Sequence, residues 1–164
     1  MKIVFCAGTS ILSKIIMWGL NEPVSHFAII MDKNLVFHSN LFGVNIQGDN
    51  YFEKSHKIVK VIDPHATVEQ ENDIYYRVVD QLDGTPYDWR TFFYFIWRAI
   101  LFRVFESTIP VTVPWNTTTD QSFLCTRMAF VLPPDWTKPL LPADILISPW
   151  QMYLTMIKNF PDQA

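Results

Sequence analysis

The spacing of hydrophobic and polar positions predicts several short strands and one helix in the first part of the chain. Apolar residues at helical spacing predict the helix over residues 11–20, with Thr9 or Ser10 as its N-cap. Short apolar or alternating runs bounded by turn residues predict strands. The strands are expected over residues 2–6, 25–31, 35–39 and 57–62, with residues 43–46 as a further short strand or a bend.

The rest of the chain has the pattern of helices. Thr67 and Gln70 have the spacing of a capping box, which predicts a helix that begins after Thr67. The helices are expected over residues 68–82, 89–105, 122–132 and 149–159, and the Pro- and Thr-rich stretch 109–121 is expected to be a loop. A group of antiparallel strands followed by helices, with no internal repeat or linker, predicts a single α+β domain over residues 1–164.

The turn at residues 32–34 predicts how the second and third strands pair. A three-residue loop with Asn34 in the left-handed conformation pairs Ala28 with His38. His26 then lies diagonally opposite His38 on the same face of the sheet, within reach of a hydrogen bond. A two-residue loop at 33–34 would instead place the two histidines on opposite faces.

Composition and charge exclude several classes of function. The hydrophobic fraction of 49% and the aromatic fraction of 15% argue against disorder, and the net charge of −3 argues against nucleic-acid binding. The sequence contains no glycine-rich phosphate-binding pattern. The apolar stretch 92–105 is shorter than the ~20 residues of a membrane span. We expect no export signal, because the apolar run at the N-terminus breaks at Gly8, and therefore a cytoplasmic or phage-delivered protein.

Cysteine and histidine side chains are the candidates for neutral-pH chemistry. Cys125 lies near the start of an expected helix, where the helix dipole favours a thiolate. Cys125, His26 and His38 could therefore act as nucleophile, base and orienting group. The alternative is that Cys125 is an inert core residue and the histidines are structural.

The remaining cysteine and histidines are assigned to structural positions. Cys6 is expected in the core, and His56 and His65, at strand ends, are expected on the surface. No spacing of histidine, cysteine and carboxylate residues suggests a metal site, and we expect no cofactor.

Several short motifs resemble the circularly permuted NlpC-type papain-like cysteine hydrolases, in the YiiX/YebB-like branch of bacteria and phages. The motifs are Ser25-His26-Phe27-Ala28-Ile29-Ile30, Val36-Phe37-His38-Ser39, Gly84-Thr85-Pro86-Tyr87-Asp88-Trp89, Ser122-Phe123-Leu124-Cys125-Thr126 and Pro142-Ala143-Asp144-Ile145. The resemblance covers residues 2 to about 158. It implies a papain-like fold in which a small antiparallel sheet packs against helices.

The resemblance also implies a reaction. Cys125 would be the nucleophile, His26 the base and His38 the third polar group, where this branch commonly has Glu. Tyr87 is a candidate oxyanion donor, with a turn tyrosine packed beside Trp89 as its structural alternative. The substrate would be an amide or peptide bond, most naturally in bacterial cell-wall peptides.

Two alternatives remain open at this point. One is an acyl ester or thioester hydrolase, and the other is a non-catalytic binding or structural module of a phage particle. The aromatic run 92–97 is expected to be a buried helix face, with contact to an acyl chain, a membrane surface or a protein partner as the functional interpretation. The residues concerned are Phe92, Phe93, Phe95 and Trp97.

Overall fold

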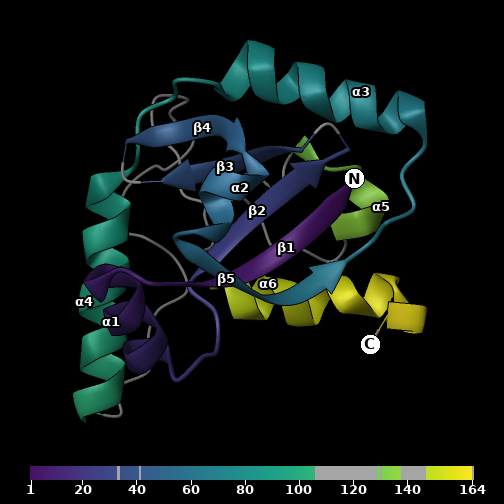
Figure 1. Cartoon of the computed structure of the whole chain (residues 1–164). Coiled ribbons are helices and arrows are strands. Elements are labelled where there is room, and N and C mark those ends of the chain that lie inside the picture. The colour runs from purple at the N-terminus through teal and green to yellow at the C-terminus, as the bar shows by residue number, and fades with distance from the viewer. Residues whose placement is uncertain (33, 41, 106–128, 130, 138–146, 164) are drawn as a thin grey trace.

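A five-stranded antiparallel sheet is the centre of the structure, which is a computed structural model that describes residues 1–32, 34–40, 42–105, 129, 131–137 and 147–163. The strand order is β4-β3-β2-β1-β5 (Figure 1). The strands are β1 (Lys2–Gly8), β2 (His26–Met31), β3 (Leu35–Asn40), β4 (Gly43–Gly48) and β5 (His56–Ile62). The α+β class and the expected strands are confirmed, and residues 43–46, expected as a strand or a bend, lie in strand β4.

Helices connect and flank these strands. They are α1 (Ile11–Leu20), α2 (Asp49–Glu53), α3 (Val68–Arg77), α4 (Trp89–Phe105), α5 (Pro134–Thr137) and α6 (Pro149–Met156). A π-helical turn (Val78–Leu82) continues α3, and short 3-10 turns follow α6 (Ile157–Asn159 and Pro161–Gln163). The short helices α2 and α5 were not expected from the sequence, because a single turn shows too little periodicity.

The helix starts follow the capping chemistry of the sequence. The side chain of Thr67 accepts a hydrogen bond from the backbone N–H of Gln70, whose own side chain accepts from Thr67 N–H, so the predicted capping box is confirmed. Ser10 caps α1 through a single hydrogen bond, which its side chain accepts from the N–H of Ser13. Each side chain satisfies a backbone donor that the first helical turn leaves without a partner.

The two faces of the sheet have different roles. On one face, large side chains such as Phe5, Phe27 and Phe37 pack against α3 and α6 and form the main hydrophobic core. On the other face, a smaller cluster includes Cys6 and Phe52 of α2. Because successive residues of a strand point to opposite faces, the strand sequences assign each side chain to one of them. The candidate site lies on the face with the smaller cluster.

Helix α4 packs against α1 at one end of the sheet (Figure 1). The two helices approach closely where Gly19 faces Ala99. Phe92 is buried, but Phe93 and Trp97 are more than half exposed. The expectation that this aromatic run is a buried helix face is therefore wrong for Phe93 and Trp97, since among the described helices α4 packs mainly against α1.

No helix in the described part of the chain is long and apolar enough to span a membrane. The expected loop over 109–121, Cys125 and most of the expected helix over 122–132 lie outside the described residues. Pro134, where that helix is expected to end, begins α5.

Candidate functional site

The β2–β3 hairpin brings two histidines together. Met31 pairs with Leu35 and Ala28 pairs with His38, which is the register predicted for a three-residue turn. Asn34 has a φ of 58°, the left-handed conformation expected of it. This register places His26 and His38 diagonally on the same face of the sheet, as predicted.

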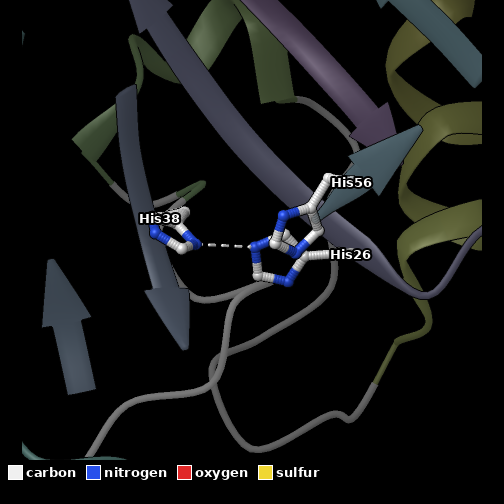
Figure 2. Close-up of side chains that lie close together, drawn as sticks. All are labelled: His26, His38 and His56. Carbon is white, nitrogen blue, oxygen red and sulfur yellow. Dashed lines mark hydrogen bonds between the residues drawn. The ribbon is translucent and has the colours of Figure 1, made fainter. Parts of the chain in front are cut away.

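The two imidazole rings make a direct hydrogen bond. Nε2 of His26 lies 3.1 Å from Nδ1 of His38, and the rings meet edge to face (Figure 2). His26 is 9% exposed and His38 is 2% exposed. Since both rings are nearly removed from water, one neutral ring donates to the other, and each can present a single N–H to its neighbours.

Burial keeps these imidazoles neutral. It lowers the pKa of His26 well below the usual histidine range, and the nearby His38 and His56 lower it further. Burial also lowers the pKa of His38 to about 4. Nε2 of His38 makes no hydrogen bond among the described residues. The side chain of Gln47 lies near this ring and partly opposes the lowering of the pKa of His38. Both rings are therefore neutral near pH 7, and the ring that donates in the His26–His38 hydrogen bond keeps a free lone pair on its other nitrogen.

A third histidine, His56, joins this pair. Its ring stacks on His26 with 4.8 Å between ring centroids, and on Phe52 with 4.3 Å. His56 is the first residue of β5 and pairs with Gly8 of β1. The expectation that His56 is a plain surface residue is therefore wrong: it is partly buried against two aromatic rings. His65 is exposed, as expected.

A β-bulge explains why His56 faces the pair. The β1–β5 register shifts between Phe5 and Cys6, so that Cys6 pairs with Ile58 and Gly8 with His56. Cys6 also pairs with His26 on its other side. Residues paired across a sheet share a face, and so the bulge puts His56 on the same face as His26. Local sequence carries no clear signal for such a shift, and for this reason His56 was expected on the surface and not beside the pair.

Hydrogen bonds fix the tautomer of His56. Its Nδ1 lies 3.3 Å from the carbonyl oxygen of Phe52 and 2.9 Å from Oγ of Ser55. A carbonyl oxygen only accepts, so Nδ1 of His56 carries the hydrogen and Nε2 keeps a lone pair. Burial lowers the pKa of His56, and the bond to Phe52 opposes this shift.

A pocket opens beside the histidines. Its volume is about 250 Å³, and its lining includes His26, His56, Ser25, Tyr87 and Phe92. The structure therefore brings the proposed oxyanion donor Tyr87 to the same pocket as His26. The ring of Tyr87 also packs edge-on against Trp89 with 5.4 Å between centroids, as the structural alternative expected.

Of the two cysteines, the structure describes Cys6 and not Cys125. Cys6 is fully buried in the smaller cluster, as expected, and burial raises the pKa of its thiol to about 12. Such a thiol stays protonated near pH 7 and is a poor nucleophile. Cys125 lies outside the described residues.

The comparisons with known proteins find no match to this chain, either among protein-family models or among curated proteins. The interpretation of the site therefore depends on the geometry of its histidines and on the chemistry of the side chains around the pocket.

Proposed function

We propose that the chain is a cysteine hydrolase with a circularly permuted NlpC-type papain-like fold, in which Cys125 is the nucleophile and His26 the base. The observation that carries the proposal is the hydrogen bond of 3.1 Å between His26 and His38 at the edge of a pocket. Thiol hydrolases need a base whose orientation and tautomer are fixed by a third group. His38 meets this requirement for His26.

The tautomer of His26 decides which of its atoms can act. When Nε2–H of His26 donates to Nδ1 of His38, Nδ1 of His26 keeps its lone pair. The ring is neutral near pH 7 because burial lowers its pKa, so the lone pair on Nδ1 is free to receive the proton of a thiol brought into contact with it. His38 is neutral too and supplies orientation without a full charge.

The proposed reaction is acyl transfer to water. The thiol proton of Cys125 passes to Nδ1 of His26 while the sulfur attacks the carbonyl carbon of the substrate. His26 then gives this proton to the leaving amine, and a thioester remains on Cys125. A water molecule attacks the thioester, with His26 again as base, and the acid product leaves. Tyr87 at the pocket is the proposed donor to the oxyanion.

The proposed substrate is an amide or peptide bond in bacterial cell-wall peptides. An acyl ester or thioester is the second candidate, because Phe93 and Trp97 of α4 expose large apolar rings that suit an acyl chain. Parallel assays with purified cell-wall peptides and with acyl thioesters separate the two. If the chain hydrolyses neither the peptides nor the thioesters but still binds peptide in the pocket, a non-catalytic binding module is favoured.

Selective alkylation of the two cysteines tests the activated thiol directly. We expect Cys125 to react quickly with iodoacetamide near pH 7, and Cys6 to react only after unfolding because its thiol is buried. His26→Ala should slow the alkylation of Cys125, and should lower hydrolysis by about 10²-fold or more. His65→Ala, at an exposed histidine away from the pocket, is the matched control. Slow alkylation of Cys125 at the same rate in all three proteins would refute the proposal.

A further inference from the structure

We propose that His26, His38 and His56 together form a binding site for a zinc-class divalent ion. The three side chains come from three strands, β2, β3 and β5, and converge on one face of the sheet (Figure 2). One nitrogen of each ring lies within 4.8 Å of the corresponding nitrogen of the other two. The site extends beyond the proposed hydrolase machinery, because His56 has no part in that reaction.

The spacing of the nitrogens is close to what a tetrahedral ion requires. Zn–N bonds of ~2.1 Å at tetrahedral angles place neighbouring ligand nitrogens about 3.4 Å apart. The 3.1 Å between His26 and His38 already approximates this spacing. His56 closes the triangle, and its separations of at most 4.8 Å must shorten. His56 is partly buried at the first position of its strand, and its ring must rotate to make this change.

The groups behind the rings fit metal ligation. A ligating histidine usually donates its other ring N–H to a backbone carbonyl or a similar acceptor, which orients the ring. Nδ1 of His56 does so toward the carbonyl oxygen of Phe52, 3.3 Å away, and this leaves Nε2 of His56 for the ion. Nε2 of His38 is buried without a hydrogen bond among the described residues, and Gln47 lies on the same face of the neighbouring strand. When Nδ1 of His38 binds the ion, Nε2–H has the Gln47 side chain as its candidate acceptor.

The donor set selects the class of ion. Three imidazoles and no carboxylate form this cluster of described residues, and imidazole suits zinc, copper and nickel better than magnesium or calcium. His26 and His56 also line the pocket. A fourth coordination position can therefore face the pocket and take up water or a ligand group.

Metal binding and base catalysis exclude each other at His26. An ion on Nε2 of His26 replaces the hydrogen bond to His38 and forces the ring hydrogen onto Nδ1. Nδ1 then cannot accept the thiol proton, so zinc would inhibit the hydrolase. This consequence rests on the proposed function, whereas the metal site itself does not.

Binding of Zn²⁺ and of its spectroscopic substitute Co²⁺ to the chelator-treated 164-residue chain tests the site. The measurements use the Cys125→Ser variant, in which the one remaining thiol, Cys6, is buried. We expect one ion per chain and a Co²⁺ ligand-field spectrum of a tetrahedral or five-coordinate nitrogen site. His56→Ala should weaken Zn²⁺ binding by at least about 10-fold, since even the loss of a group that only orients a ligand has such an effect. His65→Ala should bind as the parent does.

The same titration can also refute the proposed metal site. Equal affinity in the parent and His56→Ala, equal weakening by His65→Ala, or an octahedral Co²⁺ spectrum typical of water and oxygen ligands would each refute it. Hydrolysis by the wild-type chain is then assayed with added Zn²⁺. If the chain is not a hydrolase, this assay shows no activity while the Zn²⁺ and Co²⁺ binding data stay as they are. The two proposals can therefore fail separately.

Discussion

Nε2 of His26 lies 3.1 Å from Nδ1 of His38, although Ala28 is the residue directly opposite His38 in the sheet. The diagonal relationship exists because the hairpin turn has three residues. A turn with an even number of residues would place one of the rings on the opposite face, since side chains alternate along a strand. The turn at 32–34 therefore determines whether the pair forms.

The first prediction concerns the turn itself. Asn34 has a φ of 58°, a conformation that Gly adopts freely and that most other residues resist. Asn34→Ala should lower the free energy of unfolding by about 1 kcal/mol, whereas Asn34→Gly should leave it almost unchanged. Urea unfolding followed by fluorescence measures both. Equal losses in the two variants would show that the Asn34 side chain, and not the backbone conformation, stabilises the turn.

The second prediction concerns the junction that holds Tyr87 beside the sheet. Gly43 has a φ of 121°, and a Cβ atom there would overlap the carbonyl oxygen of Thr85. Thr85 accepts a hydrogen bond of 2.9 Å from the N–H of Val44 at this point. Gly43→Ala should therefore destabilise the fold by about 2 kcal/mol or more, because backbone must move to make room.

Gly48→Ala is the matched control for Gly43→Ala. A Cβ atom at Gly48 would meet no heavy atom within 4 Å, and its φ is −70°. We expect Gly48→Ala to change the free energy of unfolding by less than about 1 kcal/mol. Similar losses in both variants would contradict the close approach at Gly43.

The third prediction concerns the pH dependence of stability in chelator-treated protein. Burial lowers the folded-state pKa of His38 to about 4, below its unfolded value of 6.5. The unfolded chain therefore binds more protons than the folded chain between these values, and stability is lost as the pH falls from 6.5 toward 4. The loss approaches about 1.4 kcal/mol per pH unit for each such group, and His26 adds to it in the same direction.

Urea unfolding at a series of pH values measures this slope. His38→Gln removes one of the titrating rings, so its stability should fall less steeply with decreasing pH than that of the parent. The pKa of His26 should also be less depressed in this variant, because His38 contributes to that depression. A parent stability that is flat between pH 6.5 and 5, within the window set by His38, would contradict the burial of the pair.

The fourth prediction separates an orienting role of His38 from a merely structural one. His38→Gln offers an amide oxygen that can accept the N–H of His26, whereas His38→Leu offers no acceptor. We expect the leucine variant to lower kcat/KM by about 10-fold or more, and the glutamine variant to recover a large part of it. The alkylation rate of Cys125 against pH is the second measurement. If both variants lose activity equally while both remain folded, His38 does not act through a hydrogen bond to His26.

Much of the fold could be predicted because its signals are local. The capping box at Thr67, the left-handed Asn34 and the strand alternation on both sides of it depend on residues that are close in sequence. The His26–His38 pair belongs to this group, since one short turn fixes it. Helix α4 shows the limit of such reasoning: its apolar sequence suggested a buried helix, but Phe93 and Trp97 are more than half exposed, and among the described helices α1 is its main partner.

The sequence by itself determined the hairpin, its register and therefore the meeting of His26 with His38, because turn length and side-chain alternation act over a few residues. Only the tertiary structure decided that His56 joins them. Its position depends on β5 pairing with β1 and on a bulge opposite Cys6, between segments separated by some fifty residues in the chain. Such a register is selected by side-chain packing across the whole sheet. A short segment of the sequence does not show which residues will pack together there.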